Sequence, residues 1–93
     1  MEKFRISVSS KANKDLEKLY KSGKKSDIRK VENIFVELES SPRKGVGKPE
    51  QLKYYDGEVW SRRINQKDRF IYEIFDEEIV ITVIQVSGHY DEK

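Results

Sequence analysis

The 93-residue chain has no cysteine, two prolines and a single histidine. Without cysteine it cannot form a disulfide bond, a zinc finger or a thiol nucleophile. One histidine, His89, argues against a histidine-based metal site. No apolar run approaches the roughly 18 residues that a membrane-spanning helix needs. The N-terminus lacks the apolar core of a signal peptide, which predicts a cytoplasmic protein. We therefore expect neither a metal nor a membrane contact.

Charge is abundant instead: 39% of the residues are charged and 35% are hydrophobic. A chain of this length has room for one hydrophobic core, so we expect a single domain over 1–93. Residues 41–69 hold eight basic residues against four acidic ones, whereas residues 70–93 hold one against six. A basic middle segment favours a polyanionic partner such as nucleic acid. A charged face exposed to solvent explains the same pattern.

The hydrophobic periodicity changes halfway along the chain. Alternation over 4–8 predicts a strand. Apolar residues at helical spacing predict one helix that begins at Ser10 and ends just before Gly23, its left-handed cap. They predict a second helix that has Ser26 as N-cap and ends before Ser40. Strand-like segments then occupy residues 52–55, 58–64, 69–75 and 79–86. Their short connections predict hairpins. The predicted fold class is α+β, with an N-terminal strand and a two-helix hairpin packed on a twisted antiparallel β-sheet.

Two arginines face each other in one reading of the second hairpin. If its loop consists of residues 65–67, Arg63 opposes Arg69, and both guanidinium groups leave the same face of the sheet. Like charges at such positions destabilise a sheet unless an anion lies beside them, and the forked donors of arginine suit a phosphate or a carboxylate. A loop that differs by one residue sends the two arginines to opposite faces. Turn geometry is read poorly from sequence, so both registers stay open.

Other side chains supply the remaining parts of an RNA-cleaving site. Glu50, between Lys48 and Lys53, is either a salt-bridged surface group or a general base whose pKa is kept up by partial burial. His89 and Tyr90 follow the last strand, where a histidine is more often exposed than catalytic. RNA brings its own nucleophile, the 2′-hydroxyl. A base, an acid and cations for the phosphate therefore suffice, without metal or cofactor.

An aromatic residue lies next to a basic one in the first strand of that hairpin. Trp60 beside Arg62 offers a surface for stacking a nucleobase, although an aromatic residue on a strand more often belongs to the core. The predicted RNA-binding residues are Lys48, Lys53 and Arg62.

Three segments carry a resemblance to a known family: 45–53 (GVGKPEQLK), 57–64 (GEVWSRRI) and 68–72 (DRFIY), followed by the closing pair His89 and Tyr90. With them the chain resembles the YoeB (Txe) branch of the RelE-type toxins of bacterial toxin–antitoxin systems. The similarity covers the whole chain in length and element order. It is specific mainly in these segments, and the helices match only as a pattern.

The resemblance implies an endoribonuclease that cleaves mRNA in the ribosomal A site without metal and so inhibits translation. Matched position by position, Glu50 is the general base and His89 the general acid. Arg69 stabilises the scissile phosphate, and Arg63 supports phosphate binding and substrate placement. Tyr90 completes the site, and the resemblance likewise makes Lys53 one of the residues that line it.

Partners follow from the same resemblance. It implies a cognate antitoxin of the YefM type, the ribosome and its mRNA, and we expect a homodimer or a toxin–antitoxin hetero-oligomer. The basic surface should bind an acidic segment of the antitoxin as well as ribosomal RNA. Two other functions stay open. One is a non-enzymatic ParE-like toxin that poisons DNA gyrase, and the other is a non-catalytic RNA-binding domain built on Trp60, Arg62 and Arg63.

Two features depart from the family pattern. Residues 91–93 follow Tyr90, whereas the best-known member ends at the corresponding tyrosine. Gly88 stands where that member has an aromatic residue. We expect Gly88 to loosen the segment that carries His89, so that bound ribosome or RNA places the acid.

Overall fold

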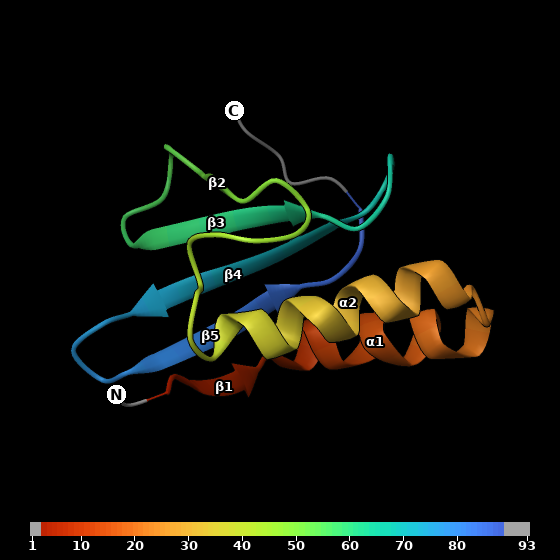
Figure 1. The fold of residues 1–93 in the computed structure, drawn as a ribbon, viewed down its shortest axis with the longest axis horizontal. Coiled ribbons are helices and arrows are strands. Elements are labelled where there is room, and N and C mark those ends of the chain that lie inside the picture. The colour runs from red at the N-terminus through yellow and green to blue at the C-terminus, as the bar shows by residue number, and fades with distance from the viewer. Residues whose placement is uncertain (1–2, 89–93) are drawn as a thin grey trace.

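The computed structural model describes residues 3–88, which form two layers (Figure 1). Strand β1 (Arg5–Val8) leads into a hairpin of two helices, α1 (Ser10–Ser22) and α2 (Lys25–Leu38). The other strands are β2 (Glu50–Gln51), β3 (Glu58–Arg63), β4 (Arg69–Phe75) and β5 (Val80–Gln85). All five strands form one sheet in the order β1-β5-β4-β3-β2. The predicted α+β fold, with the helix hairpin on the sheet, is confirmed.

The sheet is mixed. Strands β2 to β5 pair antiparallel with one another, as the short connections predict. Strand β1 pairs parallel with β5, which the predicted antiparallel sheet did not include. The parallel pairing arises because the helices and the other strands separate β1 from β5 along the chain, so no tight turn dictates an antiparallel approach.

The helices begin and end close to the predicted positions. Helix α1 ends at Ser22 and is capped by Gly23, whose φ of 70° lies in the left-handed region that favours glycine. Helix α2 starts at Lys25 with Lys24 as N-cap, so the prediction that Ser26 caps it is wrong. Because Gly23 reverses the chain at once, the helix begins before Ser26 is reached. None of the helices in residues 3–88 is long and apolar enough to cross a membrane.

The strand predicted over 52–55 is replaced by the two-residue strand β2 and a turn. Leu52 N donates to Val59 O at 2.8 Å, and the Leu52 side chain is buried with Val59 and Ile71. Beyond this anchor the chain turns away from β3. Pairing between β2 and β3 therefore ends at the apolar Leu52, and Glu50 is one of the residues that pair with β3.

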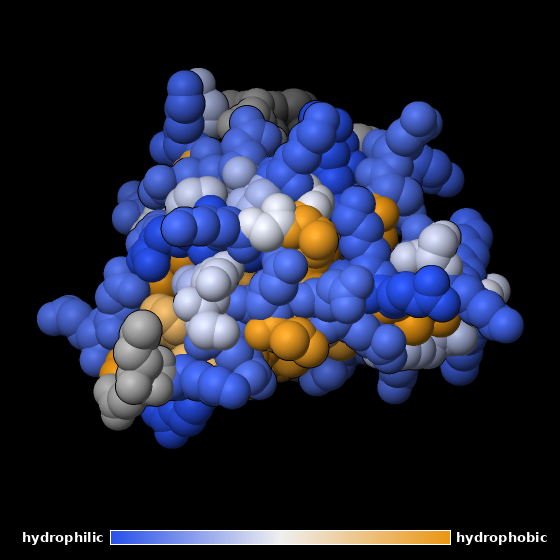
Figure 2. Space-filling model, viewed as in Figure 1, coloured by the Kyte–Doolittle hydropathy of each residue, from blue (hydrophilic) through white to orange (hydrophobic). Residues whose placement is uncertain are grey.

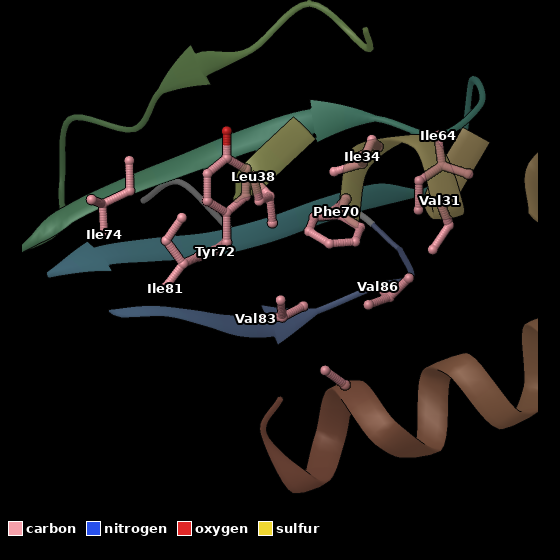
Figure 3. Close-up of a cluster of buried hydrophobic side chains, with 11 residues drawn as sticks. Val31, Ile34, Leu38, Ile64, Phe70, Tyr72, Ile74, Ile81, Val83 and Val86 are labelled. Atoms are coloured by element: carbon pink, nitrogen blue, oxygen red, sulfur yellow. The ribbon is translucent and has the colours of Figure 1, made fainter. Parts of the chain in front are cut away.

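The main core lies between the helices and one face of the sheet (Figure 3). It joins the buried side of α2 to strand residues that include Phe70 and Tyr72, whose rings meet edge to face at 5.9 Å. Residues one step along each strand point to the other face, where Val59 and Ile71 form a smaller cluster with Leu52. We call this face, which also carries Ser61 and Arg63, the open face, because both helices pack against its opposite side.

The surface reflects the high content of charged residues. The side of the molecule seen in Figure 2 is mostly hydrophilic, and its apolar atoms form small separate patches. A surface of this kind suits polar and charged partners better than a broad apolar one.

Candidate functional site

The β3–β4 hairpin places Arg63 directly opposite Arg69. Ile64 N donates to Asp68 O at 3.1 Å and thereby closes a loop of residues 65–67. Directly opposed residues on paired strands share a face, so both arginines leave the sheet on the open face. The predicted register is confirmed, and the register with the arginines on opposite faces is excluded.

Glu50 lies on the same face. Strand β2 pairs with β3 so that Glu50 opposes Ser61, and Ser61 lies two residues before Arg63 on β3, hence on the same side. The predicted base and both predicted phosphate-binding arginines therefore share the open face. Glu50 is exposed, because no element within residues 3–88 covers this short edge strand, so the partial burial that the general-base interpretation included is not found.

The Arg69 side chain is oriented by its own hairpin loop. One terminal nitrogen donates to the carbonyl oxygens of Asn65 at 2.9 Å, Asp68 at 3.1 Å and Gln66 at 3.4 Å. Within residues 3–88, no acceptor engages Nε or the second terminal nitrogen. Arg69 is thus fixed at one corner while the rest of its fork can receive an anion such as a phosphate.

The chain reaches the site again at Gly88. Arg69 N donates to Gly88 O at 3.1 Å, and Gly88 N donates to Asp68 Oδ1 at 2.9 Å. The hydrogen bond from Gly88 is the main reason why the pKa of Asp68 lies below its ordinary value. His89 follows Gly88 in the sequence, but His89 and Tyr90 lie outside the described residues. Gly88 itself is held at both backbone groups beside Arg69.

The other residues predicted to contact RNA include both exposed and buried side chains. Lys48 and Lys53 are exposed on either side of Glu50. Trp60 packs against the main core and donates Nε1 to Glu58 at 2.8 Å. The core interpretation of Trp60 fits this packing, and the stacking interpretation does not.

Arg62 lies on the opposite face from Arg63 and is 0% exposed. Its five N–H donors reach five acceptors. They are Tyr72 Oη (3.0 Å), Glu37 Oε1 (2.5 Å) and the carbonyl oxygens of Ser41 (3.1 Å), Lys44 (2.7 Å) and Val46 (3.3 Å). Arg62 therefore has no donor left and no access to a ligand. The prediction that it binds RNA is wrong, because alternation along β3 turns it into the core.

A buried carboxylate that was not among the predicted site residues supports this region. Asp15 is 7% exposed and accepts hydrogen bonds from Val86 N at 3.0 Å and Lys11 Nζ at 3.1 Å. Burial, the largest single influence, raises its pKa, but these hydrogen bonds together bring it below the ordinary value. It holds Val86, the residue just after β5 and two residues before Gly88. The signal was present, because Asp15 falls between Ala12 and Leu16 on the apolar face of α1.

Across residues 3–88, no group of acidic, histidine or cysteine side chains is arranged to hold a metal ion. The described part of the site consists of one exposed carboxylate, two opposed arginines and two flanking lysines. Such a set can remove a proton and bind a phosphate through charge and hydrogen bonds.

The chain is similar to known proteins over most of its length. The family described as "YoeB-like toxin of bacterial type II toxin-antitoxin system" matches residues 8–90. Toxin YoeB of Streptomyces coelicolor is 37% identical over 62 residues, which cover 67% of this chain and 71% of that protein. The matched family segment includes Glu50, Arg63 and Arg69.

Solved structures agree with this match. A YoeB/ParE toxin from Agrobacterium tumefaciens superposes with a TM-score of 0.80 at 28% identity, covering 94% of this chain and 100% of that one. YoeB from Staphylococcus aureus, solved as a dimer and in a heterotetrameric complex with YefM, gives TM-scores of 0.76 and 0.74 at 28% identity. In both cases the match covers 94% of this chain and 98% of the other.

Proposed function

The chain belongs to the YoeB-like toxins of bacterial type II toxin–antitoxin systems, and from this membership we propose that it is a ribosome-dependent endoribonuclease that cleaves mRNA. The observation that carries the proposal is the placement of Glu50, Arg63 and Arg69 on one open face. Two like charges opposite each other oppose folding. A site that binds a phosphate gives this arrangement a purpose.

The proposed reaction uses the RNA itself as nucleophile. Glu50 takes the proton of the 2′-hydroxyl, and the 2′-oxygen attacks the adjacent phosphorus. Arg69 and Arg63 stabilise the negative charge that builds on the phosphate oxygens. His89 gives a proton to the departing 5′-oxygen, and Tyr90 completes the site. The products are a 2′,3′-cyclic phosphate and a 5′-hydroxyl end. Because the RNA supplies the nucleophile and side chains supply the base, the acid and the positive charge, this scheme requires no metal or cofactor.

The exposure of Glu50 supports dependence on the ribosome. In the free protein this carboxylate faces water, which weakens its interactions with any substrate. RNA and ribosome laid over the open face would exclude that water and strengthen every charged contact beneath them. We propose that Lys48 and Lys53 take part in this docking through their charge.

We propose that a YefM-like antitoxin silences the protein by binding the same face. The Staphylococcus aureus relative forms a heterotetrameric complex with YefM. An acidic antitoxin segment would compete with phosphates for Arg63 and Arg69, and both contacts would weaken as salt rises. Toxin, antitoxin and translating ribosomes would meet in the cytoplasm.

Primer extension on an mRNA translated in vitro tests the proposal. The wild type should produce new ends that carry a 5′-hydroxyl. Glu50→Ala should slow their appearance by roughly 10²–10⁴-fold, the usual contribution of a general base. Glu17→Ala, which removes an exposed glutamate from α1, is the matched control and should cleave like the wild type.

Other outcomes would identify a different function. RNA bound without new ends would indicate a non-catalytic RNA-binding domain. Inhibition of DNA gyrase supercoiling by both the wild type and Glu50→Ala, without RNA cleavage, would indicate a ParE-like toxin. Undiminished cleavage by Glu50→Ala would remove Glu50 from the mechanism.

A further inference from the structure

The connection between α2 and β2 has no regular secondary structure over residues 41–49. Arg62 donates to three of its carbonyl oxygens, those of Ser41, Lys44 and Val46. Two neighbours of Arg62 hold further groups of the same segment: Tyr72 Oη donates to Pro42 O at 2.6 Å, and Val46 N donates to Glu37 Oε1 at 3.0 Å. We call Arg62, Glu37 and Tyr72 the Arg62 brace. It replaces the missing helix or strand as the support of this loop.

The braced loop leads directly into the candidate site. Gly47 O accepts a hydrogen bond from Arg63 N at 2.6 Å. The two backbones lie so close that a Cβ on Gly47 would stand 2.7 Å from Arg63 O. Glu50 follows three residues later. The position of the loop therefore sets where β2 begins and which residue opposes Ser61.

A buried arginine is a poor source of stability by itself. Removing a guanidinium group from water is costly, and well-packed apolar residues often replace buried ion pairs without loss. An apolar side chain at position 62, however, cannot donate hydrogen bonds to the carbonyl oxygens of Ser41, Lys44 and Val46. What arginine adds is five directed donors, which select one arrangement of the loop.

We infer that Arg62 is a positioning residue that acts through the 41–47 loop to place Glu50 on the open face with Arg63 and Arg69. The inference rests on the proposed ribonuclease function. It assigns to Arg62, which touches no substrate, a share of the cleavage rate, because small displacements of a catalytic group are costly in rate.

Three variants test the inference. Arg62→Lys keeps a charge for Glu37 but cannot span the three carbonyl oxygens. Arg62→Met combined with Glu37→Gln removes the charge of both partners, so no buried charge is left without a counter-ion. Ile81→Ala, which empties a fully buried position on β5, is the control for general loss of stability.

Cleavage is measured as the rate at saturating ribosomes and as the ribosome concentration that gives half of this rate. For Arg62→Lys and for the double variant we expect the saturating rate to fall by about 10- to 100-fold. The half-saturating concentration should stay nearly constant, because the donors of Arg63 and Arg69 are intact. The double variant should regain much of the stability lost in Arg62→Met alone and still cleave slowly. Ile81→Ala should cleave like the wild type wherever it is folded.

Amide hydrogen exchange gives a readout that is independent of RNA. Exchange over residues 44–51 should be faster in Arg62→Lys than in the wild type and unchanged in Ile81→Ala. Wild-type cleavage combined with full cleavage by both Arg62 variants would overturn the inference and leave the proposed function intact. Unchanged exchange over 44–51 would overturn it as well. A wild type that does not cleave would instead remove the proposed function, while the exchange comparison still decides whether Arg62 holds the loop.

Discussion

Arg62 and Arg63 are neighbours on one strand and have the same side chain, yet they serve the two faces of the sheet in opposite ways. Arg62 points toward the helices, is 0% exposed and has an acceptor for each of its donors. Arg63 points to the open face, where its partner across the hairpin is Arg69, another arginine. The strand's alternation, and not the residue type, decides which arginine supports the fold and which faces a ligand.

The two faces also differ in how their charges are balanced. On the helix-covered face, the charge of Arg62 is met inside the protein by Glu37 at 2.5 Å. On the open face, Glu50 lies on the same side of the sheet as Arg63 and Arg69, and the two arginines are directly opposed. A charge balanced within the protein contributes to the folded structure, whereas a concentration of positive charge at the surface favours an anion from outside.

The largest expected effect compares the two arginines directly. Arg62→Ala leaves Glu37 without its charged partner and three loop carbonyl oxygens without their donor, and breaking a buried ion pair in this way costs about 3–5 kcal/mol. Arg63→Ala, an exposed substitution, should change the free energy of unfolding by no more than about 0.5 kcal/mol. Urea denaturation of both variants measures the difference. Equal losses of unfolding free energy would contradict the view that Arg62 supports the fold and Arg63 does not.

Two glycines provide a second, smaller contrast. Gly45 has φ 126°, and a Cβ there would lie 1.9 Å from Glu37 Oε1. Gly23 has φ 70° and nothing within 4 Å of such a Cβ. Gly45→Ala should therefore destabilise by about 3 kcal/mol through backbone strain and collision, and Gly23→Ala by about 1 kcal/mol through its left-handed backbone alone. Thermal unfolding of both variants checks the order, and a Gly23→Ala loss as large as that of Gly45→Ala would contradict the tight packing of the loop on the Arg62 brace.

Much of the fold and of the open face was predictable from local pattern. Counting from a loop of residues 65–67 gave the opposition of Arg63 and Arg69 as one of two registers, and the structure has this one. The left-handed Gly23 marked the end of the first helix for a similar reason. In each case the information lies within a few residues of the feature, where sequence is read best.

The errors over Arg62 and over residues 52–55 have a different origin, because they concern contacts between distant parts of the chain. Arg62 lies between Trp60 and Ile64 on an apolar side of its strand, which indicated burial. Three of its five acceptors, however, come from a loop 16 to 21 residues earlier and could not be read from the sequence. The burial of Leu52, which ends β2, likewise depends on side chains of two other strands. Charge led to the RNA-binding prediction for Arg62, although three of its donors bind the distant loop and the other two bind Glu37 and Tyr72.

A third prediction concerns acid. The pKa of Asp15 is lowered in the folded protein by the hydrogen bonds that outweigh its burial, and the pKa of Asp68 is lowered chiefly by Gly88 N. A lowered pKa means that the charged form stabilises the fold above the ordinary carboxyl pKa of 3.8. This stabilisation is lost as the pH falls through the lowered value in the folded protein.

Asp15→Asn should therefore lower stability by about 1.5–3 kcal/mol at pH 7, the usual contribution of hydrogen bonds to a charged group. It should also flatten the fall in stability below about pH 4. Urea unfolding between pH 7 and pH 2 measures both effects, with the exposed Asp56→Asn as control. A wild-type stability that does not change with acid would contradict the role given to these carboxylates.

The smallest expected effect is on the salt dependence of RNA binding, which shows which arginine contacts phosphate. Association with a short single-stranded RNA, made resistant by 2′-deoxy substitution, should weaken with salt. Each phosphate contact that is removed should reduce the slope of log affinity against log salt by about 0.7. Arg63→Ala and Arg69→Ala should each show this reduction. Arg62→Lys should keep the wild-type slope even while it cleaves slowly, because the buried group touches no phosphate. A reduced slope for Arg62→Lys would mean that position 62 reaches RNA after all, so salt dependence separates a residue that binds the substrate from one that only positions the loop beside it.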